Sequence, residues 1–180
     1  MGVSASKRVK NSLANSRSFD SACDSAYAHC LSLTQHAFEG VLPYQLLAAS
    51  AHLHHTLFTL RLPLVIKWVP FPPTRAQVDS ALRAVTRKRH ENDGKSSVSC
   101  PEDEGALVLG PALFKEWALV VFAEAIVGNA TKAVLTRVPI GIAGIAGIGA
   151  IARPGKDLIG AAIGIYALGV ATSIYVSLSG

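Results

Sequence analysis

Two long stretches toward the C-terminal end of the sequence carry no charged residue, and they constrain the fold more than any other feature. One runs from Leu158 to Leu178 and has 21 residues; the other runs from Val138 to Ala152 and has 15. An α-helix rises about 1.5 Å per residue, so roughly 20 residues cross the hydrocarbon core of a bilayer. The longer stretch can therefore span a membrane, and the shorter one can do so if the helix begins at 134.

The residues between these stretches predict a tight turn. Arg153 to Asp157 combines Pro and Gly with charged side chains, which would lie at a membrane surface. Arg137, just before the shorter stretch, can extend its charged end to the lipid headgroups. The sequence therefore predicts a C-terminal helical hairpin with spans at 134–152 and 158–178.

Glycine is concentrated in the same region, with nine of the 15 glycines between residues 141 and 180. Inside a helix in water, glycine costs about 1 kcal/mol relative to alanine. In a bilayer, small residues instead let two helix backbones approach closely. We expect close packing within the hairpin or between copies of the chain. The candidate packing glycines are Gly141, Gly144, Gly147, Gly160 and Gly164.

The segment 107–128 is mostly apolar but contains Lys115, Glu116 and Glu124. A charge at the centre of a bilayer costs about 2.5–3.5 kcal/mol on insertion scales. Two interpretations stay open: an amphipathic helix lying in the membrane interface, or a third span whose charged stripe faces other helices. With the hairpin, this segment completes a predicted membrane region at 106–180.

The first residues match a pattern for lipid attachment. Gly2 follows the initial Met and a Ser stands at position 6, as in N-myristoylation signals. Basic residues follow at Lys7, Arg8 and Lys10. One myristoyl chain binds a membrane only marginally, and a basic patch adds attraction to anionic lipids. The basic, Ser-rich tail 1–17 is alternatively an organellar targeting peptide.

Residues 18–90 predict about three helices, because their apolar residues recur at the helical period. We expect these helices at 18–38, 43–60 and 74–89. Prolines predict an extended apolar stretch before the last helix, where Trp68 and Phe71 suit a partner or an interface. The last helix ends in cations expected to contact anionic lipid or a partner: Arg83, Arg87, Lys88 and Arg89.

Charge divides the chain into three regions. Only 16% of residues are charged, against about 25% in soluble proteins, and the net charge is +5. Residues 1–90 have a charge balance of +7, and residues 106–180 a balance of +2. Between them, 91–105 holds one Lys and five acids and predicts a polar linker. We expect the basic N-terminal region in the cytosol.

No pattern for catalysis or cofactor binding is present. The sequence lacks the spacings of phosphate-binding loops, dinucleotide fingerprints and serine nucleophile elbows. His52, His54 and His55 cluster, but zinc needs three or four converging ligands. Cys23 and Cys30 are interpreted as core residues or S-acylation sites. We therefore expect no enzyme activity, no metal or cofactor, and no specific nucleic-acid binding.

These features predict a small all-α integral membrane protein that acts as a subunit, adaptor or scaffold at a membrane surface. Its expected partners are membrane lipids and either a protein partner or further copies of the chain. The alternative is an oligomeric membrane-shaping or transport component built on the glycine-rich helices, with Glu116 and Glu124 along a polar path. The sequence leaves open which membrane is involved, an organellar one included. A soluble protein with a buried hairpin is disfavoured, because the rest of the chain offers too little apolar surface to cover 21 uncharged residues.

Overall fold

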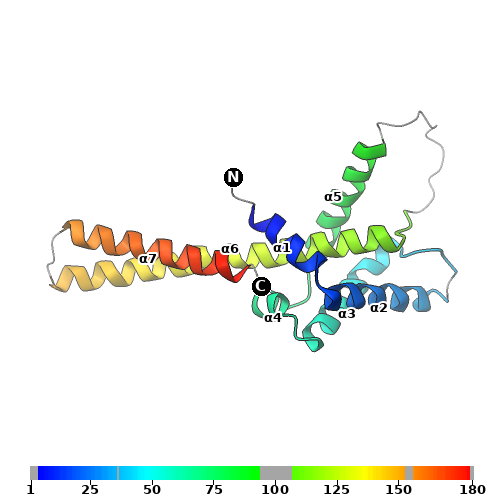
Figure 1. The fold of residues 1–180 in the computed structure, drawn as a ribbon, viewed down its shortest axis with the longest axis horizontal. Helices are drawn as coiled ribbons and strands as arrows, with labels where there is room; N and C mark the ends of the chain where they lie inside the picture. The colour runs from blue at the N-terminus through cyan, green and yellow to red at the C-terminus, as the bar shows by residue number, and fades with distance from the viewer. Residues whose placement is uncertain (1–3, 36, 94–106, 153–155, 179–180) are drawn as a thin grey trace.

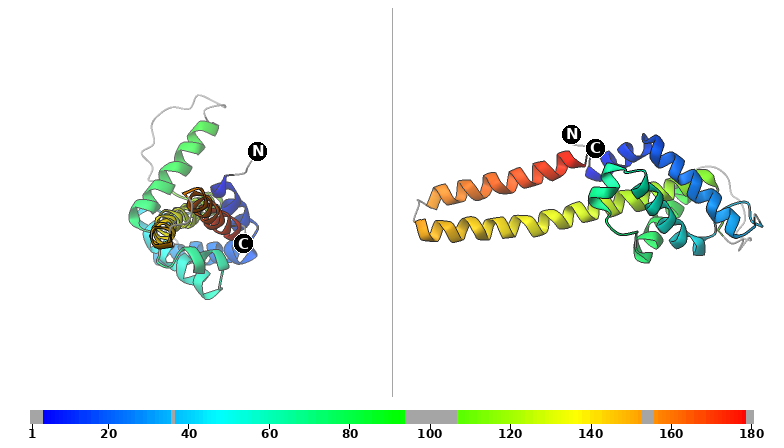
Figure 2. Two further views of the ribbon diagram at one scale, coloured as in Figure 1. Left: turned by 90° about the vertical axis from the view of Figure 1, so that its left-hand side faces the viewer. Right: turned by 90° about the horizontal axis from the view of Figure 1, so that it is seen from below.

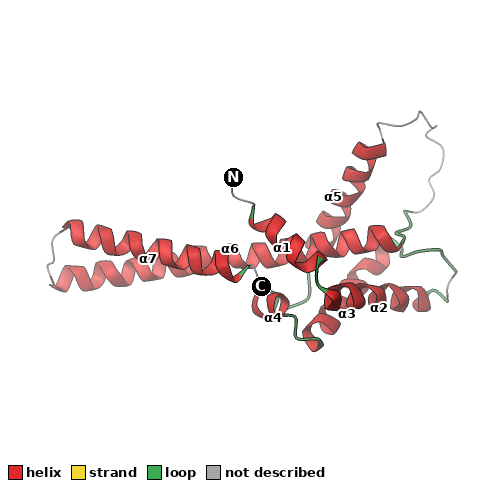
Figure 3. Ribbon diagram, in the orientation of Figure 1, coloured by secondary structure: helices red, strands yellow, loops and turns green. Residues whose placement is uncertain are grey.

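The computed structural model describes residues 4–35, 37–93, 107–152 and 156–178. Those residues form helices and loops with one isolated antiparallel bridge, which confirms the predicted all-α class (Figure 3). The elements are α1 (Ala5–Ala14), α2 (Arg17–Leu33), the 3-10 helix η1 (Pro43–Gln45), α3 (Leu46–Thr59), α4 (Pro63–Trp68), α5 (Arg75–Asp93), α6 (Pro111–Ala152) and α7 (Lys156–Ser177).

One long helix, α6, runs through most of the length of the molecule (Figure 1). It has 42 residues, which corresponds to about 63 Å. Its N-terminal half is surrounded by α1 to α5, and its C-terminal half leaves this bundle alongside α7 as a hairpin (Figure 2). The predicted helical hairpin at the C-terminal end is therefore present.

The core of the bundle is built around aromatic side chains of α6. Phe114, Trp117 and Phe122 are fully buried. The ring of Phe114 lies 5.5 Å from that of Tyr27 on α2, and Phe122 lies 6.2 Å from Phe19 on the same helix, both in edge-to-face geometry. Such pairs add about 0.5–1.5 kcal/mol beyond the area that they bury.

In the structure, α6 begins within the segment 107–128, and this part of the helix packs in the bundle. Its apolar face, with Trp117 and Val121, is covered by the other helices of the bundle rather than left for lipid. Its charges lie at the bundle surface, where Lys115 Nζ is 2.8 Å from a carboxylate oxygen of Asp20. The sequence pattern could not separate these cases, because an amphipathic helix looks the same whether lipid or protein covers it.

Two segments are long and apolar enough to cross a membrane, Pro111–Ala143 and Ile159–Ser177. A core helix of a soluble protein also meets this criterion, so their surroundings distinguish them. Of the most apolar 18 residues in each segment, 44% are buried inside the protein in the first segment but only 6% in the second. The second segment is thus far less covered by the rest of the protein than the first.

Two stretches of the N-terminal region differ from the sequence expectations. The predicted basic tail contains α1, whose Val9 and Leu13 are fully buried on one face. The stretch expected to be extended begins with the short helix α4, with Pro63 at its first turn. Proline is compatible with that position, because the first helical N–H groups have no partner within the helix.

Glycine is required where the loop after α2 crosses the start of α6. Val41 and Leu109 exchange backbone hydrogen bonds of 2.9 and 2.8 Å. A Cβ atom on the neighbouring Gly40 would collide with the Leu109 carbonyl. This contact ties the entry of α6 to the rest of the bundle.

Replacing Phe114 with alanine tests the packing of the bundle around α6. We expect Phe114→Ala to lower the free energy of unfolding by about 3–5 kcal/mol, because it leaves a cavity in the core. Urea unfolding of the detergent-solubilised protein, followed by tryptophan fluorescence, measures this change. Leu33→Ala removes an exposed side chain of α2 and should change it by less than about 0.5 kcal/mol. Equal effects of the two substitutions would contradict this core.

Candidate functional site

The hairpin exposes a large apolar surface. On α7 the side chains of Ile165 and Leu168 are 74% and 70% exposed, and on α6 Leu135 and Ile140 are similarly uncovered. Soluble monomers rarely expose continuous apolar patches larger than a few hundred Å². A surface of this kind is typical of contact with lipid or with another protein.

The two helices of the hairpin meet closely at Gly141. A Cβ atom there would collide with the ring of Tyr166, so only glycine admits this ring against the α6 backbone. The Tyr166 hydroxyl donates a hydrogen bond of 3.2 Å to the Arg137 carbonyl. Tyr166 thus fixes the separation and register of α6 and α7.

The other candidate packing glycines have different surroundings. A Cβ atom on Gly160 or Gly164 would meet nothing within 4 Å, so both glycines face away from α6. Gly144 and Gly147 lie within α6, but their surroundings are outside what the structure describes. Gly141 therefore closes the hairpin, and the GxxxG pair of α7 lies on its outer surface.

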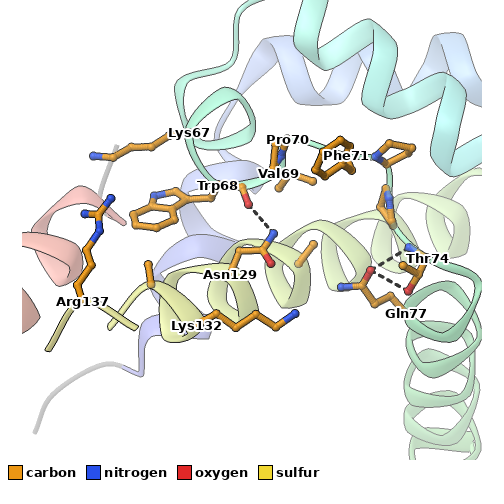
Figure 4. Close-up of a pocket in the computed structure, with 14 residues that line it drawn as sticks. Lys67, Trp68, Val69, Pro70, Phe71, Thr74, Gln77, Asn129, Lys132 and Arg137 are labelled. Carbon is orange, nitrogen blue, oxygen red and sulfur yellow. Dashed lines mark hydrogen bonds between the residues drawn. The ribbon is translucent and has the colours of Figure 1, made fainter. Parts of the chain in front are cut away.

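A cleft of about 690 Å³ lies where the hairpin joins the bundle (Figure 4). It is formed by the end of α4, the loop that follows, the start of α5, and α6 between Ala125 and Arg137. Three cations line it: Lys67, Lys132 and Arg137. Among the described residues, no acidic side chain lines this cleft. The basic cleft, as we call it, is therefore electropositive.

Trp68 forms part of the wall of the basic cleft rather than an exposed contact. Its side chain is only 6% exposed, contrary to the surface position expected from the sequence. The indole N–H has no hydrogen-bond partner among the described residues. The Trp68 carbonyl accepts a hydrogen bond of 2.7 Å from the Asn129 side-chain amide, and Lys67 Nζ lies 5.5 Å from the ring centroid. A buried donor without a partner costs about 1–3 kcal/mol, which a suitable acceptor would recover.

The loop after Trp68 is held at both ends. His54 Nε2 donates a hydrogen bond of 2.8 Å to the Val69 carbonyl. Gln77 Oε1 accepts from the Thr74 backbone N–H at 2.9 Å, which caps α5. Between these fixed points Phe71 is 78% exposed, and its role as a contact stays a prediction.

The cations predicted at the end of α5 are not part of the basic cleft. Lys88 forms an ion pair with Glu116, and Arg89 lines a separate cavity beside Pro111, at the start of α6. Glu116 and Arg137 are 21 residues apart on α6, which is about 30 Å along the helix axis. The structure therefore places two basic regions at opposite ends of the bundle.

The N-terminal cations are divided between two places. The Arg8 guanidinium lies 4.5 Å from the centroid of the Tyr175 ring, near the end of α7. Lys7 is exposed, and Lys10 lines another cleft together with Glu124. Gly2 lies outside the described residues, so its acylation stays a prediction.

The two described cysteines are poor candidates for S-acylation. Cys23 and Cys30 are fully buried. Burial raises the pKa of the Cys23 thiol to about 12 and that of Cys30 to about 11. The described residues contain no group of three or more potential metal ligands, although the rings of His29 and His52 stack at 4.3 Å.

Comparisons with protein-family models, with curated proteins and with solved structures find no match to this chain. Function therefore has to be inferred from the hairpin and the basic cleft. The sequence had pointed to Trp68 and Phe71, but not to Lys67, Asn129 or Lys132. The available signal was the pair of cations on α6 just before its uncharged stretch, together with Lys67 beside a tryptophan.

Thiol labelling tests the burial of the cysteines. In a Cys100→Ser background, Cys23 and Cys30 should react with maleimide at least about 100-fold more slowly in the native protein than in urea at pH 7.5. The reason is that only the thiolate is nucleophilic, and burial suppresses both ionisation and access. Ser25→Cys, an exposed position on α2, supplies the matched control and should label quickly in both states. Rapid native labelling of Cys23 or Cys30 would show that the core is open.

A double-mutant cycle tests the closure of the hairpin. Gly141→Ala should destabilise the protein by about 1–3 kcal/mol, because the added methyl group displaces Tyr166. In a Tyr166→Ala background the same change should cost much less. Thermal unfolding in detergent, followed by circular dichroism, measures both. Gly164→Ala is the control and should not destabilise; equal effects at Gly141 and Gly164 would contradict the close contact.

Proposed function

We propose that this chain is an integral membrane protein, with the α6–α7 hairpin crossing the bilayer and the helical bundle at one membrane surface. The observation that carries the proposal is the apolar, uncovered surface of the hairpin, of which Ile165 and Leu168 are the centre. In water this surface would be unfavourable by about 25 cal/mol for each Å² exposed. A bilayer removes that cost without any further protein contact.

The dimensions of the hairpin support two spans. From 133 to 152, α6 has 20 residues and extends about 30 Å, the thickness of the hydrocarbon core. Lys132 would lie at the surface on the bundle side, and Arg137, about 7 Å deeper, would extend back to the headgroups. The start of α7 at Lys156 would then lie at the opposite surface.

The N-terminal helix favours attachment to the same surface. Arg8 of α1 stacks on Tyr175, and Ala5 lines an apolar crevice with Ile174 and Leu178 of the α7 end. A myristoyl group on Gly2, three residues before Ala5, would therefore reach the bilayer beside the hairpin. We propose that the N-terminus, the bundle and the end of α7 share the cytosolic side.

The bundle suits a non-enzymatic adaptor or scaffold. Its helix α5 carries the exposed cations Arg83, Arg87 and Arg89, and Arg89 lines a cavity beside Pro111 at the start of α6. A partner with an acidic surface would bind these cations.

A second candidate function is supported by the outward glycines. Gly160 and Gly164 present open space on α7, which would admit the helix of a second copy. Such association would suit a membrane-shaping or transport component. The polar path considered for Glu116 and Glu124 finds no support, because both lie within the bundle and Glu116 is paired with Lys88.

Acidic substitutions on the hairpin test membrane insertion. The wild type should stay in the membrane pellet after alkaline carbonate extraction, and Ile165→Asp with Leu168→Asp should be released, because each charge is costly in hydrocarbon. Leu33→Asp, on an exposed bundle position, is the control and should remain in the pellet. Release of the wild type by carbonate would refute insertion.

The side of the membrane on which each end of the hairpin lies is tested in cells that express the protein. One cysteine at a time is introduced in the Cys100→Ser background. Ser25→Cys on the bundle and Lys156→Cys at the start of α7 should react with a membrane-impermeant maleimide from opposite sides. Labelling of both from one side would refute two complete spans.

A further inference from the structure

We propose that the basic cleft binds the phosphate group of an anionic phospholipid at the level where the hairpin enters the bilayer, with Lys67, Lys132 and Arg137 as its cationic contacts. This inference rests on the proposed membrane insertion and assigns a ligand class to the cleft.

The charge of the cleft points to an anion. Lys67 comes from α4, and Lys132 and Arg137 come from α6, so the fold brings together cations from distant parts of the sequence. None of the residues described as lining the cleft is acidic. Gathering like charges in one cleft is unfavourable without a counter-charge, and charge-assisted hydrogen bonds to phosphate are strong.

Trp68 supplies a second and independent observation. Its indole N–H is buried and has no acceptor among the described residues. In Figure 4 the side chains of Lys67 and Arg137 lie on the same side of the Trp68 ring, whereas Lys132 points toward Gln77 at the other end of the cleft. A phosphate group beside Trp68 would offer oxygen atoms as acceptors to this donor as well as to the cations. The hydrogen bond from Asn129 to the Trp68 carbonyl holds this wall in place.

The position of the cleft favours a lipid over a soluble phosphate. Lys132 and Arg137 are the last charged residues before α6 becomes uncharged, and lipid phosphates lie at the corresponding depth of a bilayer. The exposed ring of Phe71 borders the same cleft, as aromatic residues do at membrane interfaces. A lipid could place its phosphate between the cations and its glycerol and acyl groups along the apolar hairpin.

The cleft also predicts a preference among lipids. Phosphatidylcholine carries a cationic choline group next to its phosphate, which three nearby cations would repel. Phosphatidylglycerol has a phosphate without such a cation and should bind more tightly. The proposed ligand is therefore a phospholipid of net negative charge.

Fluorescence quenching measures this preference in the full-length protein. The protein is reconstituted into phosphatidylcholine vesicles that contain an equal small fraction of brominated phosphatidylglycerol or brominated phosphatidylcholine. Brominated phosphatidylglycerol should quench tryptophan emission at least about twofold more strongly, since the cations concentrate it at the cleft. In Trp68→Phe, where Trp117 remains in the bundle core, this difference should vanish, which would assign it to the cleft.

Charge-matched variants separate the site from general attraction. Lys67→Gln, Lys132→Gln and Arg137→Gln combined should abolish the preference for phosphatidylglycerol. Arg17→Gln, Arg61→Gln and Arg75→Gln combined remove the same charge from exposed positions that do not line the cleft and should retain it. Equal loss in both triple variants, or equal quenching by the two lipids in the wild type, would overturn the proposed site.

Two further measurements distinguish soluble phosphate from lipid as the ligand, and failure of the lipid site from failure of membrane insertion. If millimolar inorganic phosphate abolishes the preference, the cleft binds soluble phosphate and the lipid assignment is wrong. Carbonate treatment of the same vesicles reports insertion separately. A protein that resists carbonate but shows no lipid preference refutes the cleft alone, whereas a protein released by carbonate refutes both the insertion and the lipid site.

Discussion

The helix α6, which continues through Pro139, joins two different environments, and the positions of the other elements depend on it. Its first half is enclosed by aromatic and aliphatic side chains of the bundle, around Trp117. Beyond the basic cleft it packs against α7, which Tyr166 holds at Gly141. Because no loop interrupts the helix at this transition, α6 connects the bundle directly to the hairpin. The basic cleft lies where the bundle meets the hairpin, between α6 on one side and the end of α4 and the start of α5 on the other.

The distribution of charge along α6 follows the same transition. In the bundle, Lys115 pairs with Asp20 and Asp24, and Glu116 pairs with Lys88. These pairs are largely exposed, and exposed pairs contribute only about 0–1 kcal/mol. They therefore mark the faces of the bundle that meet water more than they hold it together. After Arg137 the helix has no charge at all, so the uncovered part of α6 is also the part that tolerates hydrocarbon.

The sequence predicted those features that depend on local pattern. The uncharged stretches on either side of Arg153 predicted the hairpin, and helical periodicity predicted most of the N-terminal helices. It missed α1, because a short basic segment becomes a stable helix only when Val9 and Leu13 find a core. It also missed the basic cleft, because Lys67 and Lys132 are 65 positions apart and only tertiary packing brings them together. The glycine content predicted close approach, but not that Tyr166 would be the partner.

The two surroundings found for glycine explain how one hairpin can serve either proposed function. Gly141 is used within the chain, since the Tyr166 ring occupies the space that a side chain would take. Gly160 and Gly164 remain open on the outer surface of α7. Lipid tails are as apolar as the helix surface, so the bilayer does not by itself drive a second hairpin onto this face. Closure of the hairpin is therefore a property of the single chain, whereas association through Gly160 and Gly164 depends on how many copies share the membrane. An adaptor and an oligomeric assembly would therefore differ in the number of copies that share the membrane rather than in the fold of the chain.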